Sequence, residues 1–190
     1  MPIADVIARG LGFSPAIEGF LVTLGYGALS AEWSSVYARL LLATQEAVQS
    51  LGLESLAAQS VIVRKLPVDR HLGVDGGTAL PAIVITPVGE AVNAAAGTNL
   101  MDDVVYGVRL TMIDRDNQEP TLVANVGRTL FWRQQISRTF RNRALAGVPE
   151  IYTAQVEPGE VVDPAAWQNN LLTSVLTLRF FSREPRGAST

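Results

Sequence analysis

The pattern of apolar and polar positions first predicts a helix that begins near residue 30. Ser30 is a residue type that favours the N-cap position, and Glu32 and Trp33 would lie in the first turn. Apolar side chains then recur at helical spacing, at Val36, Leu40, Leu41, Ala43, Ala47, Val48 and Leu51. Gly52 comes next as a residue able to end the helix. The first predicted element is therefore an amphipathic helix between Ser30 and Gly52.

Three strands are predicted next. The stretch "SVIVRKL" (60–66) is rich in β-branched residues, and "PAIVITP" (81–87) is a short apolar run bracketed by prolines. The third, "VVYGVRLTMID" (104–114), alternates, so that Val104, Tyr106, Val108, Leu110 and Met112 would share one face. Small residues dominate positions 88–103, where we expect a loop.

A second helix and two closing strands complete the pattern. Residues 121–142 carry apolar side chains on one side, at Leu122, Val126, Leu130, Phe131, Ile136 and Phe140. The last strands are predicted at 151–157 and 171–182. The order is helix, three strands, helix, two strands, which predicts an α+β fold: a mostly antiparallel sheet of about four to five strands with two helices packed on it.

Residues 1–29 differ in composition from the rest of the chain, with glycines at positions 10, 12, 19, 25 and 27. Glycine disfavours regular helix, so we expect an extended N-terminal arm, a domain over 30–187 and a short tail at 188–190. The arm either lies on the surface or docks on a neighbouring subunit, because Phe13, Phe20, Leu21 and Tyr26 are costly to expose.

Composition narrows the chemistry. The 190 residues are 48% hydrophobic and 17% charged, which is enough apolar material for one core. There is no cysteine and only one histidine, so disulfides, thiol catalysis and zinc sites built on Cys are excluded within one chain. No signal peptide or membrane-spanning run is evident, and we expect a soluble protein made in the cytoplasm without a cofactor.

Arginine gives the strongest charge signal. The predicted second helix and the residues after it contain Arg128, Arg133, Arg138, Arg141 and Arg143, with no acid between Thr121 and Pro149. At about 100° per residue these side chains do not form a single stripe. They are either a solvated helix face that complements the helix dipole, or a basic surface that meets an acidic partner or passing DNA.

Acidic residues cluster in "VEPGEVVDPAAWQNN" (156–170). Glu157, Glu160 and Asp163 are interrupted by Pro158, Gly159 and Pro164, and the spacing does not match a calcium loop. We therefore interpret the stretch as a loop between two strands rather than as a metal or catalytic site. Val161 and Val162 suggest that this loop packs, and Trp167 would anchor it.

The single histidine, His71, lies in "VDRHLGVDGG" between Asp69 and Asp75. This glycine-rich stretch lacks the Lys-Ser/Thr of a phosphate-binding loop and the dinucleotide-binding frame. An exposed loop histidine is the preferred interpretation. No hydrolase, nucleotide-binding or kinase motif occurs elsewhere, so the residues favour a binding or structural module over an enzyme.

One resemblance extends this interpretation. The segment "YTAQVEPGEVVDPAAWQNNLLTSVLTLRFFSREPRG" resembles the closing segment of tail terminator proteins of long-tailed bacteriophages. Its position after "SVIVRKLP", "PAIVITP", "VVYGVRLTMID" and an Arg-rich helix is also similar, and the likeness covers about residues 30–187. Neck and head-completion proteins share a related fold. The arm at 1–29 does not belong to the pattern.

The resemblance implies a virion protein that forms a homo-oligomeric, usually hexameric, ring. Such a ring caps the tail tube and joins it to the head–tail connector, and DNA passes through its channel without being a ligand. A ring needs two different patches on each subunit. We therefore hypothesise an interface of arginines with acids, formed by Arg128, Arg133, Arg138, Arg141, Arg143, Asp102, Asp103, Glu157, Glu160, Asp163 and the nearby Trp167.

Two alternatives stay open. A neck or head-completion adaptor between portal and tail would share the fold and the ring. A small hydrolase or metal-dependent enzyme would use His71 with Glu157, Glu160 and Asp163.

Overall fold

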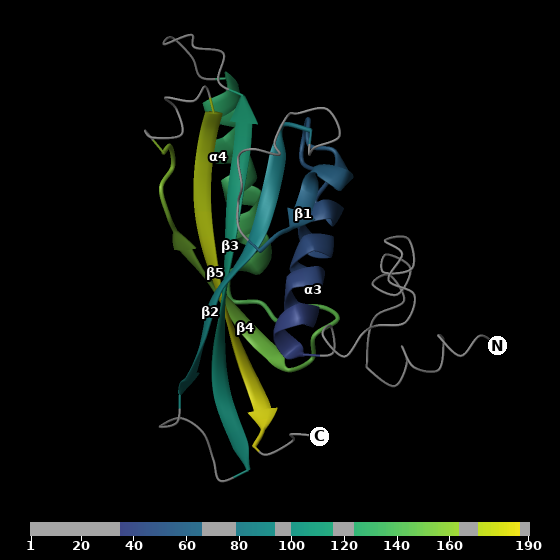
Figure 1. Ribbon diagram of the computed structural model, residues 1–190, viewed down its shortest axis with the longest axis vertical. Coiled ribbons are helices and arrows are strands. Elements are labelled where there is room, and N and C mark those ends of the chain that lie inside the picture. Colours follow the sequence, from purple (N-terminus) through teal and green to yellow (C-terminus); the bar gives the residue numbers. More distant parts are fainter. Residues whose placement is uncertain (1–34, 66–78, 94–99, 116–123, 164–170, 187–190) are drawn as a thin grey trace, which may run out of the picture.

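The computed structural model describes residues 35–65, 79–93, 100–115, 124–163 and 171–186 (Figure 1). In these ranges it has two α-helices, a short 3-10 turn and five strands, in the predicted order. The predicted α+β fold is confirmed. The predicted arm at 1–29, His71, Trp167 and the tail at 188–190 lie outside the described residues.

The sheet is mixed, and its strand order is β1-β2-β3-β5-β4. The strands span Val61–Val63 (β1), Ala82–Asn93 (β2), Met101–Arg115 (β3), Ile151–Pro158 (β4) and Leu171–Pro185 (β5). Among the described strands, only β1 and β2 pair in parallel. The other three pairings are antiparallel, and β3 lies at the centre between β2 and β5.

Both helices cover the same face of the sheet. Helix α3 (Val36–Ser50) supplies Leu40 to the core and helix α4 (Ala124–Phe140) supplies Trp132 and Ile136. These side chains pack against Leu110 of β3 and its neighbours on the same side of the sheet, and the members of this core are almost fully buried. The predicted alternation in β3 is confirmed, because every second residue from Val104 to Met112 belongs to this core.

The first helix begins later than predicted. Its N-cap is Ser35, whose hydroxyl accepts a hydrogen bond from the Ala38 amide at 3.2 Å. Ser30 precedes the described residues. The sequence offers several polar residues before the apolar stripe, and the hydroxyl nearest to that stripe is the one used. At the other end Gly52 has a φ of +55°, the left-handed conformation expected of the glycine that ends a helix.

The buried face of the second helix was predicted wrongly at two positions. Leu130 and Phe131 are 45% and 46% exposed, whereas Trp132 is fully buried. The buried stripe consists of Trp132, Ile136 and Phe140 at i, i+4 spacing. Leu130 lies about 200° around the helix from Trp132, so burial of the larger indole leaves that side chain facing out.

The loop expected over 88–103 was also wrong where the structure describes it. Strand β2 continues to Asn93, and β3 already begins at Met101. Pro87 does not end the strand, because the register between β2 and β3 shifts between Pro87 and Gly89. A register shift of this kind accommodates a proline that cannot donate to the ladder.

The acidic stretch runs beside β5 after β4 ends at Pro158. Gly159 donates its amide to the Val175 carbonyl at 3.1 Å, and Asp163 donates to the Thr173 carbonyl at 3.1 Å. A Cβ on Gly159 would lie 2.9 Å from the Val175 oxygen, so only glycine fits this approach. The loop therefore packs against β5 through its backbone, whereas Val161 and Val162, the residues from which packing was predicted, are 44% and 38% exposed.

Candidate functional site: a basic pocket and a projecting sheet edge

Four of the five predicted arginines line one pocket at the C-terminal end of α4. The pocket has a volume of about 630 Å³, and Arg133, Arg138, Arg141 and Arg143 contribute to its wall. Its apolar part comes from Leu130, Pro158 and Leu176. None of the described residues that line it is acidic. Arginines that form no single stripe in the sequence are therefore brought together.

The way in which α4 ends explains this convergence. Asn142 takes a left-handed conformation, with φ +55°, and its amide donates to the Ala154 carbonyl of β4 at 2.8 Å. The chain therefore turns back at the helix end, which places Arg141 and Arg143 beside Arg138 of the last turn. Cations at this position interact favourably with the C-terminal end of the helix dipole.

Arg133 is buried, unlike the other three. Its Nη1 donates to the Val175 carbonyl at 2.6 Å and to the Ser174 hydroxyl at 2.8 Å, and its Nη2 donates to the Gly159 carbonyl at 3.2 Å. Burial lowers the pKa of this guanidinium. Every described partner is a neutral oxygen, so Arg133 fixes the start of the acidic stretch against β5 without having its charge neutralised.

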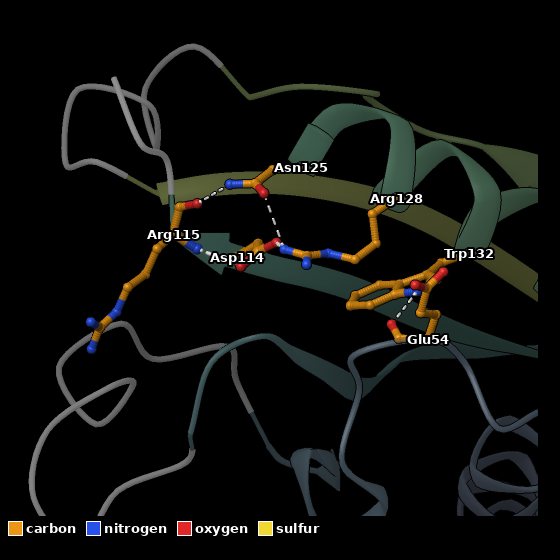
Figure 2. A network of polar contacts seen from close by, with 6 residues as sticks. All are labelled: Glu54, Asp114, Arg115, Asn125, Arg128 and Trp132. Carbon is orange, nitrogen blue, oxygen red and sulfur yellow. Dashed lines mark hydrogen bonds and ion pairs between the residues drawn. The ribbon is translucent and has the colours of Figure 1, made fainter. Parts of the chain in front are cut away.

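Arg128 belongs to a different environment (Figure 2). It forms an ion pair with Asp114 at the end of β3, and its Nη2 also contacts the Asn125 amide oxygen at 3.2 Å. The guanidinium carbon lies 5.8 Å from the centre of the Trp132 ring, whose Nε1 donates to the Glu54 carbonyl at 3.2 Å. Trp132 is thus both a core residue and an arginine partner.

The predicted acids mostly pair within the chain. Asp103 binds Arg183 at 2.7 Å and Glu157 binds Arg179 at 2.7 Å, both between neighbouring strands, and Asp102 binds Arg186, just after β5, at 2.6 Å. The Arg183 guanidinium lowers the pKa of Asp103. The side chain of Glu160 is exposed, while its carbonyl accepts hydrogen bonds from Arg133 and from the Val175 amide.

None of these ion pairs joins a predicted acid to an arginine of the pocket. The hypothesis that acids and arginines meet across subunits therefore stays a prediction. The arginine partners of these acids were missed by the sequence analysis: Arg179 and Arg183 lie on β5, which pairs with β3 and β4, and Arg186 directly follows it. Only the register of β3, β4 and β5 could have identified them.

A second surface lies where the sheet extends beyond its helices. The lower ends of β2, β3 and β5 project past α3 and α4 (Figure 1). Strand β1 pairs with β2 only at Ile83–Ile85, so no strand among the described residues pairs with the outer edge of β2 from Glu90 to Asn93. Val88 and Val92 are 50% and 60% exposed on this strand.

Two tyrosines mark the base of the projection. Tyr37 of α3 accepts hydrogen bonds from the Val88 and Gly89 amides at 3.0 and 3.1 Å, and donates to the Gly107 carbonyl at 2.5 Å. Its ring lies 4.9 Å from that of Tyr106, whose hydroxyl donates to Glu184 at 2.6 Å. Burial raises the pKa of both tyrosines, and the Glu184 carboxylate raises that of Tyr106 further.

Within the described ranges, no group of three or more His, Asp or Glu side chains could hold a metal ion. No helix in the same part of the chain is both long and apolar enough to span a membrane. Comparisons with protein-family models and with curated proteins found no match for this chain.

Proposed function

We propose that this chain is a structural virion protein of a long-tailed bacteriophage, a tail terminator that forms a ring. The ring would cap the tail tube, stop its growth and join it to the head–tail connector. The proposal starts from the likeness of the segment 152–187 and of the elements before it to tail terminators. A helix, three strands, an arginine-rich helix and two strands occur in that order.

The projecting edge of β2 is the observation that supports ring formation best. A closed ring needs heterologous contacts, in which one patch of a subunit meets a different patch of its neighbour. A strand that carries exposed valines and has an unpaired backbone edge is suited to such contacts, and is prone to unwanted pairing when it is left open. Val92 is 60% exposed while its register partner Val104 is 8% exposed.

The mass of the purified chain in solution tests this proposal. We expect native mass spectrometry to find a single closed oligomer, with six copies as the first expectation. Val92→Lys should shift the oligomer toward monomer, because a charge on an edge strand opposes pairing. Phe131→Lys is the matched control, since Phe131 is 46% exposed on α4, and it should leave the oligomer intact.

Binding distinguishes the terminator from the neck adaptor. A terminator must bind the end of the tail tube as well as the connector, and an adaptor binds the connector and portal side alone. Surface plasmon resonance against the purified tail-tube and connector proteins separates the two. A monomer that hydrolyses a substrate and binds neither protein would contradict both structural roles and favour the enzyme.

A further inference from the structure

We propose that the pocket at the C-terminal end of α4 binds a carboxylate-rich segment of another protein chain. This assignment goes beyond the proposed function and does not depend on ring formation, because a single folded subunit already contains the whole pocket. The occupant is an acidic peptide segment, inserted so that its side chains meet Arg138, Arg141 and Arg143.

The first support is the exposure of these three arginines and their lack of a partner in the described ranges. They are exposed, and none of their guanidinium groups has a hydrogen bond or ion pair with any residue in the described ranges. Among the described residues, five other arginines form ion pairs, namely Arg39, Arg128, Arg179, Arg183 and Arg186. Cations without a carboxylate partner in the described part of the chain thus converge on one pocket, although the net charge of the protein is −3.

The second support is Arg133. Buried charges in proteins are normally paired with an opposite charge. Arg133 is 8% exposed, and its described partners are the carbonyls of Gly159, Glu160 and Val175 and the hydroxyl of Ser174. Its position is fixed by these bonds while its charge is not compensated, so the pocket keeps a positive charge that a bound carboxylate would neutralise.

The shape of the pocket favours a peptide over DNA. A duplex presents phosphates along the outside of a wide cylinder, and proteins meet it with cations spread over a broad surface. Here the arginines converge on about 630 Å³, a size typical of sites that enclose a ligand or a few side chains. Leu130, Pro158 and Leu176 add an apolar wall suited to the aliphatic part of a glutamate.

The hydrogen-bond donors that line the pocket determine which class of ligand it binds. Guanidinium groups are planar and bind carboxylates through two parallel hydrogen bonds. The amide side chains of Gln134 and Asn142 also line the pocket and can donate to a carboxylate or to a peptide carbonyl. A segment with two or more acidic residues would use several of these donors together.

Fluorescence anisotropy with a labelled hexaglutamate peptide and the full chain tests this assignment. We expect saturable binding that weakens at least tenfold in Arg138→Glu/Arg141→Glu, and that also weakens as salt is added. The matched control is Arg64→Glu/Arg109→Glu, which makes the same charge change at two exposed arginines outside the pocket. This control should retain affinity within about twofold once salt screens long-range attraction.

The variant Arg138→Gln/Arg141→Gln controls for misfolding of the Glu variant, because glutamates at a helix C-terminus interact unfavourably with the helix dipole. It should keep the thermal unfolding of the wild type and still lose most of the affinity. The assignment is overturned if folded wild-type protein does not bind the peptide, or if both double variants to Glu lose affinity equally. It is also overturned if a short DNA duplex binds the pocket more tightly than the peptide does.

Discussion

The two halves of the long strands are stabilised in different ways. Near Ile85, Leu110 and Leu178 the sheet is covered by helices and these side chains are fully buried. Toward Asn93, Met101 and Pro185 the same strands project beyond the helices, and ion pairs join neighbouring strands. One half is thus stabilised by apolar burial, while the other is held by backbone pairing and surface ion pairs, and no described strand pairs with its outer edge on β2.

The largest expected effect tests the helix-covered half. Trp132→Ala should lower the free energy of unfolding by about 3–5 kcal/mol, because it empties a fully buried site and removes the hydrogen bond to the Glu54 carbonyl. Phe131→Ala, at a neighbouring exposed position on the same helix, should cost less than about 1 kcal/mol. Equal losses in urea unfolding would contradict the packing described for α4.

A pair of changes within β2 compares the two halves directly. Ile85→Ala should cost about 2–5 kcal/mol, because Ile85 is fully buried in the core. Val92→Ala should change the free energy of unfolding of the monomer by less than about 0.5 kcal/mol, because Val92 is largely exposed. Urea unfolding at low protein concentration measures both. A large loss at Val92 would mean that the projection is part of the core.

The polar contacts of arginines should show the same contrast between the two halves of the sheet, with smaller effects on the free energy of unfolding. Arg133→Met should lower the free energy of unfolding by roughly 1–3 kcal/mol, because the buried Ser174 hydroxyl and the part-buried Gly159 carbonyl lose the guanidinium that donates to them. Arg186→Met in the projection removes a surface ion pair and should leave the unfolding midpoint unchanged within error. A loss at Arg186 as large as that at Arg133 would show that the surface pairs carry more stability than this comparison assigns.

The smallest effect is a pH dependence of the projection. The hydrogen bond from Arg183 lowers the pKa of Asp103 below the ordinary value of 3.8. The ionised Asp103 carboxylate therefore stabilises the folded protein at pH values above 3.8. That contribution is lost as the pH falls through the lowered pKa. Thermal unfolding should therefore show Asp103→Asn less stable than wild type at neutral pH and equal to it at strongly acidic pH. A difference that persists in acid would rule out the ionised pair as its cause.

The sequence predicted the fold because its periodic segments are long and their order is simple. The five strands and two helices were predicted from apolar spacing together with β-branched runs, flanking prolines and capping residues, and Gly52 ended the first helix where expected. The extension of β2 through Asn93 was missed because exposed, small residues give no alternation signal. Leu130 and Phe131 were predicted to be buried because the helical spacing of apolar residues is compatible with either of two neighbouring faces of the helix. The bulk of Trp132 decides which of these faces is buried.

The candidate sites were less predictable than the fold. The arginines of α4 and of the turn after it were found from charge, yet their convergence depends on the turn at Asn142, which spacing along the chain does not reveal. From the sequence, Asp102, Asp103 and Glu157 were candidates for contacts with another subunit. Pairing of β5 with both β3 and β4 places an arginine of β5, or the one that directly follows it, beside each of them.

Hydrogen exchange of the free and assembled chain tests the central claim most directly, that the projecting edge of β2 is an assembly surface. On assembly, alone or with the tail-tube protein, we predict slower exchange of the Glu90–Asn93 amides and unchanged exchange at Ile83–Ile85. The helix-covered segment serves as the internal control. Exchange at Glu90–Asn93 that is equally fast in the free chain and in the assembled chain would contradict the claim.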